Sequence, residues 1–95
     1  MDYNIESIIL PNSVENIGDK SFGMLKSLKE ITVPMSVREI ISPFFYNANG
    51  VTIKFNGTKE QWSNIELSEK WNYNSSSDNE KIVETIHCTN GDIIL

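Results

Sequence analysis

The sequence predicts a repeat solenoid that is mainly β, and three observations predict it. First, residues 28–50 repeat residues 5–27 at an offset of 23 positions. Second, each copy carries a short run in which apolar and other residues alternate. Third, a proline closes each run. The identities at this offset pair Ile8 with Ile31, Pro11 with Pro34, Ser13 with Ser36, Val14 with Val37, Ile17 with Ile40, and Phe22 with Phe45.

Each copy begins with a strand, expected over Ile5–Leu10 and again over Leu28–Val33. Alternation with period two is typical of a strand with one buried face. Proline has no N–H to donate to a sheet, so it ends the strand. A period of about 20–29 residues with one such strand per unit is typical of a leucine-rich-repeat solenoid. One unit cannot bury its own apolar face, so equivalent residues of successive units must stack into columns.

A third strand and a short helix follow the second repeat. Val51–Phe55 alternates, with Val51, Ile53 and Phe55 on one face, but the pattern of the repeat is then abandoned. Thr58 and Gln61 form a capping box, which predicts a helix from Lys59. We expect this helix to turn Trp62 inward and to cover the open end of the core. Residues 56–58 also match a glycosylation pattern, although helix capping is the preferred interpretation.

The C-terminal part predicts a loop and then a hairpin. Asn72–Glu80 is rich in Asn and Ser, which is typical of a flexible surface loop. We expect a strand at Lys81–His87 and a return over Asp92–Leu95. Asn90-Gly91 between them is typical of a type I′ turn, which needs positive φ at both central residues. Together these elements predict one structural domain, with repeats over 1–55 and a C-terminal cap over 56–95.

These residues resemble the BspA-type leucine-rich repeats of bacterial surface proteins. Pro11, Ser13, Val14, Ile17, Gly18 and Phe22 fit the family pattern in the first unit, and Pro34, Ser36, Val37, Ile40 and Phe45 fit it in the second. Ser21 and Phe44 stand where the family usually has alanine, and Ile41 replaces the glycine. The resemblance implies an extracellular or cell-surface protein. The alternative is a cytoplasmic protein that uses the same repeat, since residues 1–9 do not resemble a signal peptide.

Composition and charge narrow the classes of partner. The chain has 95 residues, 39% of them hydrophobic and 22% charged, and a net charge of −5. This composition is that of a single soluble globular domain. Acidic residues outnumber basic ones in both halves, so there is no basic stripe for nucleic acid or for an anionic membrane surface. No apolar run approaches the ~20 residues of a membrane span.

No set of residues predicts catalysis, a metal or a cofactor. His87 and Cys88 are the only residues of their kinds, and as neighbours on a strand they point to opposite faces. A zinc site needs about four ligands at set spacings, which this chain cannot supply from Cys and His. The sequence therefore predicts a protein that is not an enzyme.

Two groups of acidic residues have the chemistry of a site, but their patterns favour a polar surface. Glu60, Glu66 and Glu69 could serve a glycosidase, but their spacing is that of a solvated helix face. Residues 78–80, Asp-Asn-Glu, lack the alternating ligands and central glycine of an EF-hand loop. A polar surface is the better interpretation of both groups.

The exposed side of the repeat sheet is the expected binding surface, because solenoids use such faces to bind extended ligands. The expected positions are Ser7, Ile9, Glu30, Thr32, Thr52 and Lys54. Trp71 and Tyr73 are weaker candidates. The predicted function is a non-catalytic module that binds protein or glycan. The alternative is a purely structural cap of a longer array. Self-association through the open edge at Ile5–Leu10 is also expected.

Overall fold

The computed structural model describes residues 5–17, 27–40, 50–68, 71–74 and 77–95. Within these ranges the chain is mostly strand, with one short helix. In chain order the elements are β1 (Ser7–Ile9), β2 (Asn16–Ile17), β3 (Glu30–Val33), β4 (Glu39–Ile40), β5 (Val51–Phe55), α1 (Lys59–Ser63), β6 (Glu66–Leu67), β7 (Tyr73–Asn74), β8 (Ser77–Lys81), β9 (Val83–Cys88) and β10 (Gly91–Ile94).

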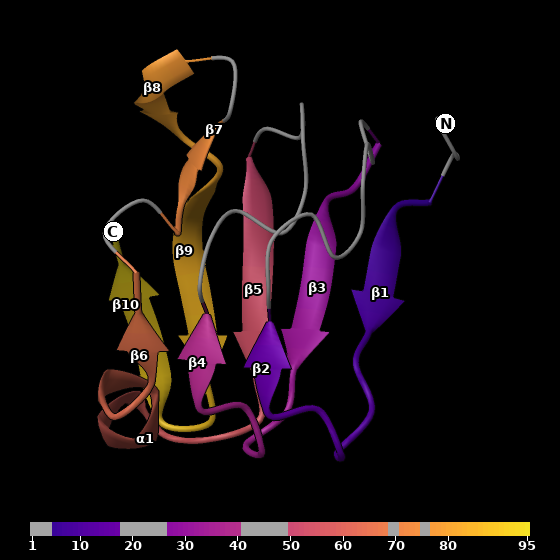
Figure 1. Cartoon of the computed structure of the whole chain (residues 1–95), viewed down its shortest axis with the longest axis vertical. Helices are drawn as coiled ribbons and strands as arrows, with labels where there is room; N and C mark the ends of the chain where they lie inside the picture. The colour runs from indigo at the N-terminus through magenta and orange to yellow at the C-terminus, as the bar shows by residue number, and fades with distance from the viewer. Residues whose placement is uncertain (1–4, 18–26, 41–49, 69–70, 75–76) are drawn as a thin grey trace.

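Two sheets form the walls of the solenoid. The larger has the order β1-β3-β5-β9-β10, and the smaller has the order β2-β4-β6 (Figure 1). The chain passes from the larger sheet to the smaller one three times, from β1 to β2, from β3 to β4, and from β5 through α1 to β6. We call each such passage a coil. All strand pairs between successive coils are parallel, as expected when each coil repeats the course of the one before.

The register confirms the columns that the 23-residue offset predicts. Ile8 pairs with Ile31 in the larger sheet, and Ile17 pairs with Ile40 in the smaller one. Ile17, Ile31 and Ile40 are each at most 2% exposed. The anchors Phe22 and Phe45 lie outside the described residues.

The third coil keeps both sheets, so the expectation that it abandons the repeat is wrong. Ile53 pairs with Ile31, and Leu67 pairs with Ile40. Ile31 and Ile40 are nine positions apart, whereas Ile53 and Leu67 are fourteen apart. The five additional residues match the length of α1, which is therefore an insertion between two strand positions that are equivalent by register.

Local chemistry starts α1 where the sequence predicts. The Thr58 hydroxyl accepts a hydrogen bond from Gln61 N–H at 3.1 Å, and Thr58 N–H donates to Gln61 Oε1 at 2.8 Å. The side chain of Asn90, in the β9–β10 turn, accepts a further bond from Lys59 N–H at 2.9 Å. These bonds satisfy backbone donors that a helix N-terminus otherwise leaves unpaired.

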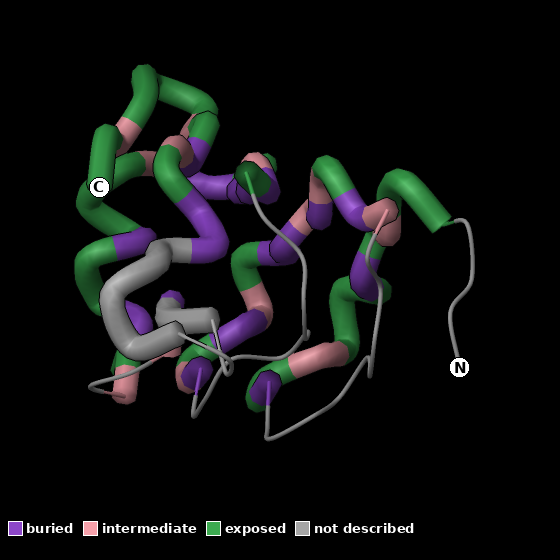
Figure 2. Tube along the Cα trace, turned by 90° about the horizontal axis from the view of Figure 1, so that it is seen from above, coloured by how far each residue is buried: buried purple, intermediate pink, exposed green. Residues whose placement is uncertain are grey.

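The apolar core lies between the two sheets and extends to α1 and β9 (Figure 2). Val51, Ile53 and Phe55 point into it, as their alternation predicts. Trp62 on α1 is 4% exposed and meets the Phe55 ring edge-on at a centroid distance of 5.3 Å. Burying a side chain of this size contributes about 1.5–3 kcal/mol, so α1 is attached to the core through Trp62.

The predicted loop at Asn72–Glu80 is wrong, because this stretch contains two paired strands. β7 and β8 are antiparallel, with Asn74 opposite Ser77. The predicted strand at Lys81–His87 is also divided, since β8 ends at Lys81 and β9 begins at Val83. Backbone pairing satisfies polar residues as well as apolar ones, so an Asn- and Ser-rich composition did not prevent strand formation.

The C-terminal hairpin is confirmed, but its turn lies one residue earlier than predicted. Gly91 pairs with Cys88, so the two turn residues are Thr89 and Asn90. Gly91 has a φ of 142°, a conformation that favours glycine. β9 runs parallel to β5 and β10 returns antiparallel, so the hairpin extends the larger sheet.

Candidate functional site

The structure places all six expected sheet positions on one side of the larger sheet. Ser7, Glu30 and Thr52 are register partners in one row, and Ile9, Thr32 and Lys54 are partners in the next. Neighbouring strands lie about 4.8 Å apart, so each row is closely spaced. Ser7, Ile9 and Lys54 are exposed and the other three are half-buried.

The predicted hairpin lengthens this side of the sheet by two strands, and its residues join a surface that the sequence predicted only as far as Lys54. Thr85 pairs with Thr52, and His87 pairs with Lys54. The rows end on β10, at Ile94 and Asp92. We call the ten residues of both rows the outer face: Ser7, Ile9, Glu30, Thr32, Thr52, Lys54, Thr85, His87, Asp92 and Ile94.

A register shift hid the four additional residues from sequence reasoning. Val51 pairs with Val83 but Thr52 pairs with Thr85, so Glu84 is an extra residue in β9. A bulge of this kind moves every later residue by one position. Without knowledge of the bulge, alternation alone cannot align β9 with β5. The Asn90-Gly91 hairpin signal was the one feature that indicated a further pair of strands here.

The outer face is polar at its centre and apolar at two of its corners. His87 Nδ1 lies 2.7 Å from Asp92 Oδ1, and the two side chains are about half exposed. Ile9 is 78% exposed and Ile94 is 75% exposed, and they lie on the two edge strands. The outer face thus has an isoleucine at each edge and polar groups between them.

The two weaker candidates do not extend this surface. Trp71 is half-buried and packs on Trp62, with ring centroids 5.9 Å apart, so it belongs to the aromatic cluster beside α1. The backbone of Tyr73 lies in β7, and its side chain is outside what the structure describes.

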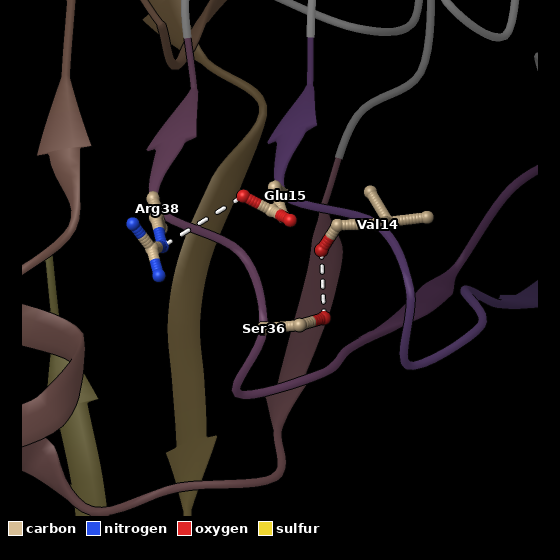
Figure 3. A network of polar contacts seen from close by, with 4 residues as sticks. All are labelled: Val14, Glu15, Ser36 and Arg38. Carbon is tan, nitrogen blue, oxygen red and sulfur yellow. Dashed lines mark hydrogen bonds and ion pairs between the residues drawn. The ribbon is translucent and has the colours of Figure 1, made fainter.

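Polar contacts join the β1–β2 connection of the first coil to the β3–β4 connection of the second coil. Ser36 Oγ donates to the carbonyl oxygen of Val14 at 2.6 Å, and Arg38 Nε lies 3.8 Å from Glu15 Oε1 (Figure 3). The backbone N–H of Arg38 also donates to the Glu15 carbonyl at 2.7 Å. The serine of the P-x-S-V signature thus has a structural role, which is to bond one coil to the preceding one.

A groove with a volume of about 520 Å³ lies between α1 and the β3–β4 connection. Its apolar lining comes from Met35, Val37, Phe55 and Ile65. Its polar lining comes from Asn16, Arg38, Glu39, Gln61, Asn64 and Glu66. Three of these polar residues, Asn16, Glu39 and Glu66, are register partners across the smaller sheet. The sequence did not predict this groove, because it depends on where the α1 insertion lies relative to the second coil.

Glu60 and Glu66, two of the three glutamates that could serve a glycosidase, lie on different elements. Glu60 Oε1 accepts a hydrogen bond from Asn90 Nδ2 at 3.1 Å. Hydrogen bonds from its own backbone N–H and from Asn90 lower the pKa of Glu60. Glu66 lies in β6 and Glu69 is outside the described residues. Glu60 therefore serves the junction of α1 with the hairpin.

His87 and Cys88 point to opposite sides of β9, as expected. His87 belongs to the outer face, and Cys88 packs against the core. Burial raises the pKa of the Cys88 thiol, which keeps it protonated and weakly nucleophilic at neutral pH. In the described part of the chain no three His, Cys, Asp or Glu residues gather as a metal site.

Comparison with known families decides the classification. The family model described as "BspA type Leucine rich repeat region (6 copies)" matches residues 1–88. The chain belongs to this family. No curated protein and no solved structure matches the chain. BspA-type repeat proteins are generally surface or interaction proteins and are not generally catalytic. None of the described helices has the length and apolar character needed to span a membrane.

Proposed function

We propose that this BspA-type chain is a non-catalytic binding module that holds a protein or glycan ligand on its outer face, at the cell surface or outside the cell. The observation that carries the proposal is the continuity of this face. Five strands in register present two rows of side chains across the larger sheet. Solenoids use extended sheet surfaces to bind their partners.

The composition of the outer face supports binding better than simple solvation. Ile9 and Ile94 are more than 70% exposed, and each can contribute apolar contact area. Threonine, histidine and carboxylate groups between them can donate and accept hydrogen bonds. Interfaces commonly combine apolar contact with such polar groups.

A substitution at the centre of the outer face tests the proposal. Thr52→Glu adds a carboxylate there, and Thr89→Glu makes the same change in the hairpin turn, away from the face. We expect the native chain to bind members of an array of extracellular-matrix proteins, glycans and bacterial cell-wall fragments. The T52E variant should lose these signals and the T89E variant should keep them. Equal binding by both variants would contradict a role for the outer face.

A structural role is the second candidate, and one observation favours it. The hairpin pairs with β5 and so covers that edge of the repeat strands, and Asn90 bonds the hairpin to the N-terminus of α1. On this alternative they cap the repeats of residues 1–55 and bind nothing. Deleting residues 56–95 would then lower the stability of the repeats, with no ligand found for the intact chain in the array. Binding that T52E abolishes would exclude this alternative.

A further inference from the structure

We propose that the groove between α1 and the β3–β4 connection binds an arginine side chain of an extended partner peptide. This site lies beside the smaller sheet, and none of the outer-face residues lines it. It does not depend on the function proposed above. The inference rests on the shape of the groove, its apolar lining and the sign of its charge.

The groove exists because the third coil carries an insertion. The five residues of α1 lie between β5 and β6, whereas the second coil connects β3 to β4 without a helix. Gln61, Asn64 and Ile65 therefore form one side of the groove, and Met35 and Val37 form the other. The volume of about 520 Å³ is within the range of about 300–1,000 Å³ that is typical of ligand sites.

The lining can hold the stem of a long side chain. Met35 is 58% exposed, which is unusual for a methionine beside a core. Val37, Phe55 and Ile65 are almost fully buried beneath it. Methionine is an adaptable contact residue at binding surfaces. The alkyl part of an arginine or lysine packs well on such a surface while its charged head stays near water.

The charge of the groove selects a cation. Glu39 and Glu66 are register partners on adjacent strands, so their Cα atoms lie about 5 Å apart. Arg38, the one cation that lines the groove among the described residues, is paired with Glu15 of the first coil (Figure 3). A net charge of −5 also favours a basic partner at longer range.

The geometry favours arginine over lysine. The guanidinium group is planar and has five N–H donors in a fixed arrangement, so it can bond to two neighbouring carboxylates at once. The ammonium group of lysine is compact and more strongly hydrated. Amide oxygens of Asn16, Gln61 and Asn64 can accept the remaining guanidinium N–H groups. In the described residues no three potential metal ligands gather, so an organic cation fits better than a metal ion.

Titration by nuclear magnetic resonance with a defined peptide tests the site. The probe is a blocked hexapeptide, acetyl-Gly-Ala-Arg-Leu-Ala-Gly-amide, and its control replaces arginine by citrulline, which has a similar shape but no charge. We expect the arginine peptide to shift the amide signals of Glu39, Ile65 and Glu66, with a Kd on the order of 1 mM or lower. The citrulline peptide should bind at least about tenfold more weakly, because it loses two charged contacts.

Two matched variants separate the groove from general electrostatics. The E39Q/E66Q variant removes both groove carboxylates, and the E6Q/E84Q variant makes the same change of net charge elsewhere. We expect E39Q/E66Q to raise the Kd of the arginine peptide about tenfold. E6Q/E84Q should leave this Kd within about twofold of the value for the native chain. Met35→Ala should weaken binding of the arginine peptide severalfold, because the alkyl stem of the arginine loses its contact with Met35. Thermal unfolding of each variant is the control: a transition like that of the native chain shows that the variant is folded.

Several results would overturn the proposal. Equal affinity for the arginine and citrulline peptides would show that charge does not select the ligand. Equal effects of the two double variants would show that net charge alone attracts the peptide. Signal shifts confined to Ile9, Thr32 and Lys54 would place the peptide on the outer face. Absence of any shift at several millimolar peptide would show that the groove does not bind arginine.

Discussion

At the scale of single residues, the junction between α1 and the hairpin depends on a few exact contacts. Gly57 N-terminal to the helix has no room for a side chain, because an added Cβ would lie 2.6 Å from Phe55 Cε2 and 2.7 Å from Gln61 Oε1. The Gly57 carbonyl accepts a hydrogen bond from Thr89 N–H at 2.8 Å. Close approach of backbone to side chains, rather than an unusual φ, therefore requires glycine here.

Gly57→Ala should destabilise the fold by about 1–3 kcal/mol, which is the usual cost of overpacking. The Phe55 ring is buried and cannot move freely, and moving Gln61 would break the capping box. The free energy of urea unfolding measures the effect. Gly50→Ala is the comparison, because its Cβ would contact nothing within 4 Å and only the φ of 66° opposes it. A G57A variant as stable as the native chain would contradict the packing described for this junction.

Asn90→Ala should raise the pKa of Glu60 toward the ordinary value for a glutamate. The pKa is lowered by the Glu60 backbone N–H and then by the Asn90 side chain, and the variant removes the second contribution. A lowered folded-state pKa stabilises the fold above the unfolded pKa, and this contribution is lost as the pH falls through the folded value. The stability difference between native and N90A chains should therefore shrink as the pH falls. Carboxyl carbon shifts of Glu60 across a pH titration measure the change, and an unchanged pKa would contradict the contact.

At the scale of elements, Asn72 holds the start of β9 in place. It is 7% exposed, its Nδ2 donates to the Val83 carbonyl at 2.7 Å, and its Oδ1 accepts from Val83 N–H at 2.6 Å. The Asn72 carbonyl also accepts from Ile82 N–H at 2.9 Å. One asparagine thus satisfies the backbone where β8 ends and β9 begins.

Asn72→Ala should lower the free energy of unfolding by about 1–3 kcal/mol, because it leaves the buried N–H and carbonyl of Val83 without the Asn72 side chain as a partner. Asn56→Ala, at an exposed asparagine, should stay within about 0.5 kcal/mol of the native chain. Thermal unfolding compares the two variants. Hydrogen exchange at Val83 should also accelerate in N72A, and equal protection in both variants would show that Asn72 is dispensable.

Local signals explain which elements the sequence predicted. β5 was placed at its exact bounds because its alternation is unbroken, and α1 was started correctly because Thr58 and Gln61 lie within one turn. β6 was missed because two residues, Glu66 and Leu67, carry no signature and are displaced by the insertion. β7 and β8 were missed because their pairing is not reflected in hydrophobicity. Asn72, which holds the start of β9, has no sequence signature that distinguishes it from the other asparagines of this stretch.

The candidate sites were predictable to different degrees for the same reason. Four residues of the outer face, Ser7, Ile9, Glu30 and Thr32, follow from the 23-residue offset, which fixes the register between β1 and β3. Thr52 and Lys54 follow from the alternation of β5. Thr85, His87, Asp92 and Ile94 depend on the bulge at Glu84, which long-range pairing reveals and local patterns do not. The groove depends on the position of α1 relative to Met35, so it required the assembled fold.

At the scale of the whole molecule, β1 is an edge strand of the larger sheet among the described residues. We propose that the chain self-associates through this edge, because an exposed strand edge is a template for pairing. Ile9→Lys should lower the association constant by placing a charge there. Sedimentation velocity across a concentration series measures it. A native chain that is monomeric at all concentrations would contradict the proposal.

The central claim is that the hairpin continues the repeat sheet, so that one surface runs from β1 to β10. Nuclear Overhauser contacts between backbone protons of β5 and β9 test it most directly. We predict cross-strand contacts that pair Thr52 with Thr85 and Lys54 with His87, together with contacts that pair Ile40 with Leu67 in the smaller sheet. Contacts that place Glu84 opposite Thr52, or no contacts between β5 and β9, would divide the outer face and contradict the claim.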